Sequence, residues 1–384
     1  MAEAILIAAQ SGRALAEAAR RAGMRPFVAD LFGDSDTLAL SEAYRPLPSR
    51  FGSPMAFEAT LAAIDALAET AGSVVGLVLG SGFEDAPGLI ARAAERHRLV
   101  GADAPAVAAL KDPFALAALC VRLDIPHPKI ATDARPDPSG WLLKRTGGSG
   151  GSHIRPAGRG PAPDAHYFQA RVPGRPHALN FLADGRAIQM LAVTEQWCAP
   201  SPIRPYRFGG AATGAATEAR LLPDALIATV AEAVESIVAA TGLRGLGSAD
   251  FLVDGSGCWW LTEINPRPGA TLDILDRRST PLLAAHIAAS LGAMPALGAQ
   301  PADAAAAQIC YAGREHAPVP DFAWPDHVRD RPRPGTVVRR DAPLCTVLAH
   351  GADRQMALDS LNTRTARLQA DLTAEKMHPE ETLR

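Results

Sequence analysis

The sequence predicts an α/β domain, followed by an α+β region and a small β-rich C-terminal domain. Over residues 1–106, apolar runs typical of buried strands alternate with helical segments, as in proteins built on a parallel sheet. Over residues 107–300 the pattern changes to strands joined by hairpin turns, and a proline-rich passage marks a third part at 301–384. The length of 384 residues fits several domains, because single hydrophobic cores stop growing at roughly 250 to 300 residues.

The first part repeats the order of strand and helix. A buried-strand run begins at Ile5 and leads through a Ser-Gly turn into an Ala/Arg-rich helix that ends at Gly23. The predicted elements that follow are a strand over 26–32, a helix over 56–72, a strand over 74–82 with a glycine turn at its carboxyl end, and a helix over 85–97. This order predicts a parallel sheet covered by helices.

The second and third parts combine helices with antiparallel strands. We expect Lys111, Asp112 and Pro113 to open a helix, and Asp184 and Gly185 to turn a hairpin. The other predicted elements are a strand within 141–154, hairpin strands over 177–183 and 186–193, a loop over 198–214, a helix over 223–242, a hairpin turn at 254–257, short strands over 336–340 and 344–350, and a terminal helix.

The composition is that of an ordinary globular protein. Apolar residues make up 48% and charged residues 21%, close to the usual values of about 45 to 50% and about 25%, which disfavours a disordered or membrane class. The formal net charge of -3 gives no broad field to attract nucleic acid or anionic lipid, so we expect neither as a partner. The sequence has no run of about 18 apolar residues and no basic leader segment, and we expect a cytoplasmic protein.

The cysteines predict no metal or redox centre, because none of them falls in a C-x-x-C pair. We expect buried thiols in a reducing compartment. The five cysteines are Cys120, Cys198, Cys258, Cys310 and Cys345.

Asp250, Glu263 and Asn265 form the most informative group of polar residues. If the turn closes its hairpin symmetrically, Asp250 lies opposite Leu261, and Glu263 lies one diagonal step away, about 7 to 8 Å between backbones. Asn265 shares that face because side chains alternate along a strand. Two carboxylates and an amide are oxygen ligands of the kind that Mg²⁺ uses when it also binds substrate phosphates. The alternative interpretation is an exposed polar face with a chance E-x-N sequence.

A run of glycines from Gly147 to Gly151 follows a strand that carries Lys144. Glycines let backbone N–H groups approach a polyphosphate, and a lysine ammonium adds a point charge. One alternative is a flexible hairpin loop, and another is a serine hydrolase, since the run matches G-x-S-x-G with Ser149 as nucleophile. That motif requires a helix after the turn, which the proline-rich sequel at 153–163 cannot form, so a phosphate contact explains Ser149 better.

In chain order, Lys111, then Lys144 with its glycine loop, then Asp250, Glu263 and Asn265 resemble the ATP-grasp superfamily. The resemblance implies the ATP-grasp fold, with a Rossmann-like parallel-sheet domain first and ATP bound between two α+β subdomains after it. It implies that the two lysines hold phosphates and that the three oxygen ligands hold two Mg²⁺ ions, with Mn²⁺ as an alternative. The residues that it assigns to the nucleotide are Lys111, Lys144, Gly147, Gly148, Ser149, Gly150, Gly151, Ser152, His153, Gln169, Arg171 and Val172.

A narrower likeness rests on six segments spread over the chain. They are SGRALAEAARRAG (11–23), VADLFGDSDT (28–37), GSGFED (80–85), TEQW (194–197), YRFGGA (206–211) and EINPRPGATLD (263–273). These segments are similar to predicted ATP-dependent carboligases related to biotin carboxylase, whose members often accompany one-carbon carrier biosynthesis. A related archaeal group includes tyramine-glutamate ligase. Residues 301–384 resemble the small last domain of biotin-dependent carboxylases, so the likeness covers nearly the whole chain.

The chain departs from the superfamily at two places. The hinge that meets adenine and ribose carries Gln169, Arg171 and Val172 and no acid. Ser248 stands where amino-acid ligases have an arginine two residues before the metal aspartate, so Arg267 becomes the candidate for stabilising charge in the transition state.

The resemblance implies a carboxylate–amine ligase that forms an amide through an acyl phosphate and releases ADP and phosphate, in methanofuran- or methanopterin-type cofactor biosynthesis. Lys144 and Arg267 are the candidate catalytic residues. The candidate substrate contacts are Glu195, Gln196, Tyr206 and Arg207. The implied partners are a small carboxylate, an amine and a second copy of the chain in a homodimer. The alternatives are a bicarbonate-activating, carboxylase-like enzyme and a non-catalytic ATP-binding scaffold.

Overall fold

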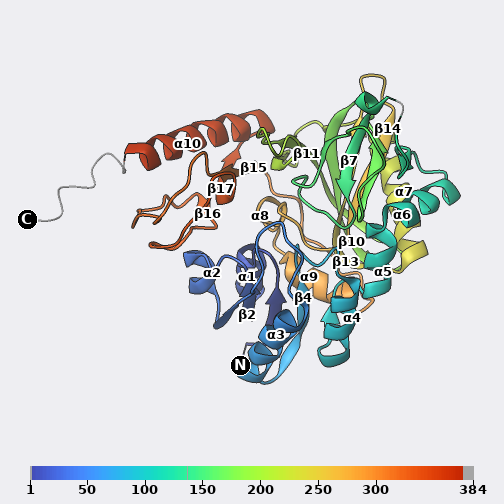
Figure 1. Cartoon of the computed structure of the whole chain (residues 1–384). Coiled ribbons are helices and arrows are strands. Elements are labelled where there is room, and N and C mark those ends of the chain that lie inside the picture. The colour runs from blue at the N-terminus through green and yellow to red at the C-terminus, as the bar shows by residue number, and fades with distance from the viewer. Residues whose placement is uncertain (1, 136, 375–384) are drawn as a thin grey trace, which may run out of the picture.

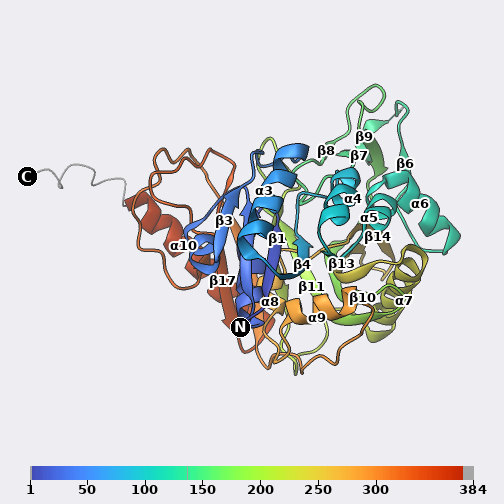
Figure 2. The ribbon, with the colours of Figure 1, turned by 90° about the horizontal axis from the view of Figure 1, so that it is seen from below.

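The computed structural model describes residues 2–135 and 137–374. In Figure 1 the chain runs from a blue N-terminal domain, through a cyan and green region, to a red C-terminal helix, and Figure 2 gives the view from below. The described residues form a five-stranded parallel sheet, a four-stranded antiparallel sheet and an eight-stranded antiparallel sheet. The predicted combination of α/β and α+β architecture is confirmed.

The N-terminal domain is built on the parallel sheet, in the strand order β3-β2-β1-β4-β5. Its strands are β1 (Ala4–Ala8), β2 (Arg25–Asp30), β3 (Ala43–Pro46), β4 (Val74–Leu79) and β5 (Leu99–Val100). Its helices are α1 (Arg13–Arg21), α2 (Ser35–Leu40), α3 (Phe57–Ala71) and α4 (Pro87–Arg96). Every residue of β1 is buried, because this strand lies between two others and under helices. Strand β3 and helix α2 were not predicted.

Helix α1 shows how the sequence determines these elements. Its alanines and leucine give it a strong helix propensity, and Leu15, Ala16 and Ala19 form the buried face. Gly23 ends the helical segment with a φ of +73°, a left-handed conformation that glycine adopts without strain.

Two short helices and the four-stranded sheet come next. The helices are α5 (Ala104–Lys111) and α6 (Pro113–Arg122), with a 3-10 turn η1 (Pro138–Gly140). The sheet, in the order β6-β9-β7-β8, contains β6 (Ile130–Ala131), β7 (Trp141–Arg145), β8 (Arg155–Pro156) and β9 (His166–Ala170). Asp112 separates the two helices, because its carboxylate accepts the backbone N–H groups of Phe114 and Ala115 and thereby caps α6.

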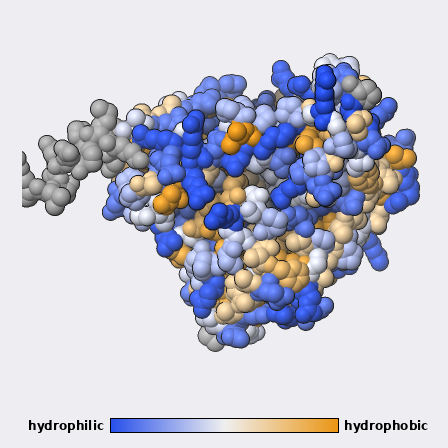
Figure 3. Space-filling model, in the orientation of Figure 1, coloured by the Kyte–Doolittle hydropathy of each residue, from blue (hydrophilic) through white to orange (hydrophobic). Residues whose placement is uncertain are grey.

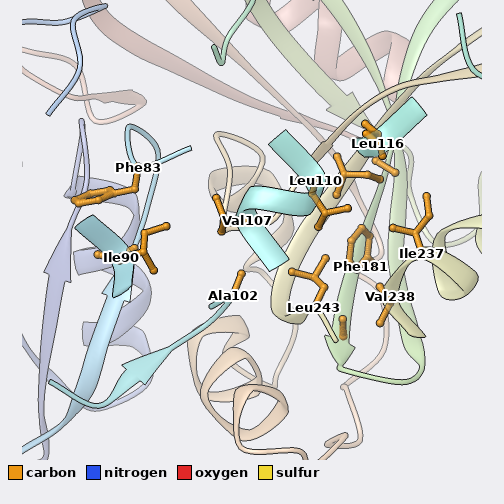
Figure 4. Close-up of a cluster of buried hydrophobic side chains, with 14 of the residues drawn as sticks. Phe83, Ile90, Ala102, Val107, Leu110, Leu116, Phe181, Ile237, Val238 and Leu243 are labelled. Carbon is orange, nitrogen blue, oxygen red and sulfur yellow. The ribbon is translucent and has the colours of Figure 1, made fainter. Parts of the chain in front are cut away.

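The apolar core connects the N-terminal domain to the rest of the chain. Figure 4 shows Val107 and Leu110 of α5 between Phe83 and Ile90 on one side and Phe181 on the other.

Among the described residues, no single helix is long and apolar enough to cross a membrane. Only α5 and α6 taken together pass that test, and they are bent by 84°.

The large antiparallel sheet has the order β14-β13-β10-β11-β12-β15-β17-β16. Its strands are β10 (Arg175–Asp184), β11 (Ile188–Cys198), β12 (Phe208–Thr213), β13 (Arg244–Val253), β14 (Trp259–Asn265), β15 (Ala304–Tyr311), β16 (Val328–Arg329) and β17 (Pro343–Gly351). Its helices are α7 (Asp224–Thr241), α8 (Leu272–Leu275), α9 (Leu282–Ser290) and α10 (Arg354–Ala374). Helix α10, red in Figure 1, packs on β15 and β17.

Other sequence-based expectations of secondary structure also differ from the structure. The glycine-rich segment 198–214, expected as a loop, contains strand β12, because the small residues let it pair closely with β11 and β15. The expected strand at 336–340 is only a single bridge between Val338 and His316. Strand β15 was missed, and it joins the C-terminal strands to the large sheet. The three-part domain division stays a prediction.

The surface and the cysteines show the usual segregation of polar and apolar groups, with two exceptions. On the face shown in Figure 3, hydrophilic side chains dominate and hydrophobic ones gather in smaller patches. Cys120, Cys310 and Cys345 are buried, as expected, whereas Cys198 and Cys258 are exposed because they lie at strand and turn ends.

Candidate active site

Asp250 of β13 and Glu263 of β14 lie directly opposite each other. The expected diagonal arrangement, with Asp250 opposite Leu261, was wrong, because the register shifts between Asp250 and Phe251. Thr262 is the extra residue of this irregularity, and its hydroxyl donates to the backbone oxygen of Asp250 over 2.9 Å. The bulge therefore brings the two carboxylates closer than a regular hairpin would.

Asn265 completes the group on the same pair of strands. Its Nδ2 donates to Oδ2 of Asp250 over 2.9 Å, and Nε2 of Gln196 on β11 approaches Oδ1 of Asp250 at 3.3 Å. Burial and the neighbouring charge of Glu263 raise the pKa of Asp250. A carboxylate in this situation gains from a bound cation, and the two acids and one amide oxygen fit the oxygen preference of Mg²⁺. The described residues contain no group of three or more His, Cys, Asp or Glu side chains that could hold a metal ion.

Lys111 contacts this group directly. Its Nζ forms an ion pair with Glu263 and lies 3.4 Å from Oδ1 of Asn265, and the residue is 7% exposed. Burial alone would raise the pKa of Glu263, but the charges of Lys111 and Lys144 outweigh it and lower this pKa. We expected Lys111 to open a helix, but it does not. It is the last residue of α5, because the helix-capping Asp112 starts α6 immediately after it.

Lys144 lies on β7, in the four-stranded sheet, and is 4% exposed. Its Nζ lies 3.3 Å from Oε1 of Gln169 on β9 and 5.9 Å from the ring centroid of Tyr167. Burial lowers the pKa of Lys144, and the charges of Glu263 and Asp250 oppose that shift. Both candidate lysines are thus buried cations directed toward the same two carboxylates.

The glycine loop joins β7 to β8 and is followed by no helix, which disagrees with the geometry of a serine-hydrolase turn. Gly147 and Gly151 have φ values of +67° and +68°. A Cβ on Gly151 would lie 2.0 Å from the backbone oxygen of Tyr206, so only glycine allows this approach. The backbone N–H of Phe208 donates to Gly150 over 2.8 Å, and the loop therefore lies against the start of β12.

His153 ends the loop and lines the central cavity. Burial first and the Lys144 charge second lower the pKa of His153 to about 3, which keeps its imidazole neutral at pH 7. Its buried Nδ1 has no hydrogen-bond partner in the structure. A buried polar atom of this kind is a candidate for contact with a ligand.

Arg267 is held by a residue of the N-terminal domain that the sequence did not single out. Its Nε donates to Oε1 of Glu84 over 2.8 Å, and Glu84 is 4% exposed. Burial alone would raise the pKa of Glu84, but the charges of Arg267 and then Lys111 outweigh it and lower this pKa. The segment GSGFED had been noted only for its likeness, and nothing local to it indicated a partner 183 residues away.

The four candidate substrate contacts do not lie together. Gln196 reaches Asp250 and lines the cavity. Glu195 points to the other face of β11 and approaches Arg354 of α10 at 3.6 Å. Arg207 pairs with Asp341 over 2.9 Å, and its guanidinium lies 3.8 Å from the ring centroid of Tyr311. Tyr206 contributes its backbone to the contact with the glycine loop.

The hinge residues lie around the end of β9. Gln169 is buried and contacts Lys144, whereas Arg171 is exposed and Val172 is half-buried beyond the strand. The segment leads from the small sheet directly into β10 of the large sheet. It is therefore the direct connection between the two sheets.

A cavity of about 630 Å³ lies where the N-terminal domain, the glycine loop and the large sheet meet. Lys111, Lys144 and Glu263 are not among its lining residues, so these three lie behind its wall. The glycine loop contributes Ser149, Ser152 and His153 to the lining. Strands β11, β13 and β14 and the segment after β14 contribute Gln196, Ser248, Asp250, Asn265 and Arg267. From the N-terminal domain, and missed by sequence reasoning, it includes Gln10, Ser11, Phe32, Asp34, Gly80 and Ser81. The last six lie beyond the carboxyl ends of parallel strands, where ligands of open α/β sheets bind.

Comparison with known proteins identifies the fold. A family model described as an ATP-grasp domain matches residues 115–271. The biotin carboxylase from Campylobacter jejuni is similar, with 16% identity, a TM-score of 0.68 and coverage of 94% of this chain and 90% of that one. The biotin carboxylase domain of 2-oxoglutarate carboxylase from Hydrogenobacter thermophilus is 12% identical, with a TM-score of 0.67 and coverage of 97% and 89%.

The L-amino acid ligase from Bacillus licheniformis is similar to the same extent, with 14% identity, a TM-score of 0.67 and coverage of 96% of this chain and 97% of that one. No curated protein matched by sequence. ATP-grasp enzymes bind ATP and Mg²⁺, and the predicted resemblance is confirmed at the level of the fold. Residues 115–271 therefore match an ATP-grasp domain, and the chain has the fold that the biotin carboxylases and the L-amino acid ligase share.

Proposed function

We propose that the protein is a Mg·ATP-dependent carboxylate–amine ligase that forms an amide through an acyl phosphate. One observation carries the proposal: Lys111 pairs with Glu263 directly opposite Asp250, and Asn265 and the cavity lie beside them. This arrangement joins a cation for phosphate to oxygen ligands for a metal. The fold that the chain shares with ligases and carboxylases supports it.

Mg·ATP supplies the phosphoryl group for transfer, with the metal neutralising charge on the phosphate oxygens. Asp250, Glu263 and Asn265 are proposed to bind the metal, for which their oxygens are suitable donors. Lys111 and Lys144 are proposed to bind phosphate. The buried position of both lysines supports this role, since a charge interaction is stronger where water is excluded.

In the first step an oxygen of the substrate carboxylate forms a bond to the γ-phosphorus, and the bond from that phosphorus to the β,γ-bridging oxygen breaks. ADP leaves with the electron pair of the broken bond. In the second step the amine nitrogen bonds to the activated carbonyl carbon, and phosphate leaves with the electrons of its C–O bond. The nitrogen loses one proton, and the product is an amide.

Arg267 is proposed to stabilise the oxyanion of the second step. Glu84 fixes the Nε end of its guanidinium, Nη1 donates to the backbone oxygen of Pro268 over 3.3 Å, and the residue lines the cavity. His153, Ser149 and Ser152 are proposed as neutral contacts to phosphate from the loop. Gln169, Arg171 and Val172 are proposed to meet the nucleoside, although Gln169 would first have to release Lys144.

The test is ADP release from Mg·ATP with hydroxylamine as a surrogate amine, across glutamate, related carboxylic acids and bicarbonate. The proposal predicts that at least one carboxylic acid gives ADP together with a hydroxamate. Glu263→Gln, which removes the charge that Lys111 pairs with, should lose this activity while keeping its fold by circular dichroism. ADP release with no hydroxamate from any acid would contradict amide formation.

Bicarbonate activation is a second candidate, favoured by the similarity to biotin carboxylases, one of which was solved with MgADP and bicarbonate. ADP release that depends on bicarbonate alone would support it. ATP binding without ADP from any acid would favour the non-catalytic scaffold. A homodimer, a cytoplasmic location and a role in one-carbon cofactor biosynthesis stay predictions.

A further inference from the structure

A cluster of carboxylates lies at one end of the cavity, where the loop after β2 meets the C-terminal segment before β17. Asp34 interacts electrostatically there with Asp30, Asp36 and Asp330. The other three are satisfied: Asp30 and Asp36 each accept backbone N–H groups at 2.8 to 3.2 Å, and Asp330 accepts from Arg13 and from a threonine hydroxyl. These hydrogen bonds compensate for the burial of the three carboxylates, so none of them requires a ligand.

Asp34 differs from its neighbours. It occupies the N-cap position of α2, where an aspartate normally accepts helix N–H groups, but its side chain makes no such bond. Across residues 2–135 and 137–374, no hydrogen bond or ion pair involves its carboxylate. It is nevertheless only 7% exposed, and it lines the cavity.

Within the described part of the chain, the cation that acts on Asp34 is already paired. Arg13 is the cation that acts on it electrostatically, but Arg13 already pairs with Asp273 and Asp330. Burial, and then the charges of Asp330, Asp30 and Asp36, raise the pKa of Asp34. An unpaired carboxylate in such a place destabilises the empty protein, and a cationic ligand would remove that cost.

The neighbouring wall of the cavity is apolar. Phe32, two residues before Asp34, and Phe51 both line it, with ring centroids 5.9 Å apart and planes tilted by 44°. Arg145 of β7 and Arg267 after β14 line the same cavity away from Asp34. Arg13 also lines it, but its charge is paired with Asp273 and Asp330. The cavity thus joins an acidic, aromatic end to a basic end suited to phosphate and carboxylate.

We propose that Asp34 binds the protonated amino group of an amine-bearing substrate whose apolar part packs against Phe32 and Phe51. This inference rests on the proposed ligase function, because it names the place and the class of the second substrate. Asp34 is here a binding residue. The bound ammonium first loses one proton to water, and the neutral amine then attacks and loses its second proton as the amide forms.

The experiment is titration calorimetry on the full chain with 2-phenylethylamine and butylamine, and with 2-phenylethanol as the uncharged control. We expect the amines to bind and the alcohol to bind at least tenfold more weakly. Asp34→Asn should weaken amine binding at least tenfold and leave Mg·ATP affinity unchanged. Asp36→Asn is the matched control, since it removes a charge from the same cluster and should change amine affinity less than threefold. Equal binding of amine and alcohol, equal affinity in wild type and Asp34→Asn, or no saturable binding of either amine would overturn the inference.

Two further readouts separate this inference from the ligase proposal and from a structural role. Hydroxylamine is small and largely uncharged at neutral pH, so hydroxamate formation by the wild type tests the ligase proposal without depending on amine binding at Asp34. Absence of hydroxamate in the wild type would count against the ligase only, and amine binding would still report on Asp34. Asp34→Asn should also unfold at the same or a higher temperature than wild type, whereas a clear decrease would mean that Asp34 supports the fold and would overturn its assignment as a ligand-binding residue.

Discussion

Asp250 and Glu263 lie directly opposite each other on β13 and β14, yet their pKa values shift in opposite directions. Burial and the Glu263 charge raise that of Asp250, whereas Lys111 and Lys144, against the effect of burial, lower that of Glu263. The pair therefore contains one carboxylate that is stable as an anion and one that needs a cation.

The first prediction concerns the pH dependence of metal binding. A raised pKa means that protons compete with Mg²⁺ at Asp250, so Mg²⁺ affinity should fall as the pH decreases from about 8 to about 5. The measurement is titration of Mg²⁺ into the complex with a non-hydrolysable ATP analogue. Asp250→Asn should bind Mg²⁺ more weakly and with little pH dependence. A wild-type affinity that stays constant over this range would show that Asp250 is not a ligand.

The second prediction concerns the ion pair of Lys111 and Glu263. Lys111→Met should lower the free energy of unfolding by about 1 to 3 kcal/mol, less than the roughly 3 to 5 kcal/mol of a fully buried pair, because the Glu263 side chain is 20% exposed. Urea denaturation measures this value. The double variant with Glu263→Gln should cost less than the sum of the single changes. Additive effects would mean that the two side chains do not interact in solution.

The order of site residues along the chain could be predicted from the sequence, because each type has a chemical signature. A lysine before a glycine run, as at Lys144, and acids at alternating strand positions can each be recognised within a single segment of the sequence. The direct pairing of Asp250 with Glu263 could not be predicted, since it depends on an extra residue, Thr262, that no turn or glycine signals.

Long-range contacts and alanine-rich strands were also beyond sequence reasoning. The hydrogen bond from Arg267 to Glu84 joins residues 183 positions apart, and neither residue has a local pattern that indicates the other. Strand β15 reads AAAAQICY, a composition that favours a helix, and only its neighbours β12 and β17 make it a strand. Asp34 was not singled out from the sequence, and the structure places it at the N-cap of α2 without a side-chain capping bond.

The third prediction separates Lys144 from other lysines. Lys144→Ala should weaken ATP binding at least tenfold, which is about 1.4 kcal/mol, because it removes a buried cation beside the proposed phosphate site. Lys129→Ala is the matched control, since Lys129 is exposed, and it should leave affinity unchanged. Fluorescence titration with a labelled nucleotide measures both. Equal affinity in the two variants would remove Lys144 from the site.

The fourth prediction concerns the support of Arg267 by Glu84. Glu84→Gln keeps a hydrogen-bond acceptor but removes the charge, so Arg267 should lose orientation. We expect amide formed per ADP to fall about tenfold, less than the 10²- to 10³-fold loss typical when an oxyanion donor is removed. ADP release and ATP affinity should change little. The exposed Glu69→Gln serves as control. A proportional loss of ADP and amide would place Glu84 in the first step instead.

The most direct test of the acyl phosphate uses the accepted carboxylic acid labelled with oxygen-18 in its carboxylate. The account predicts that one labelled oxygen appears in inorganic phosphate and the other stays in the amide, because the attacking carboxylate oxygen leaves with phosphorus. Label in AMP, or amide formation with no label in phosphate, would contradict activation of the carboxylate by the γ-phosphoryl group.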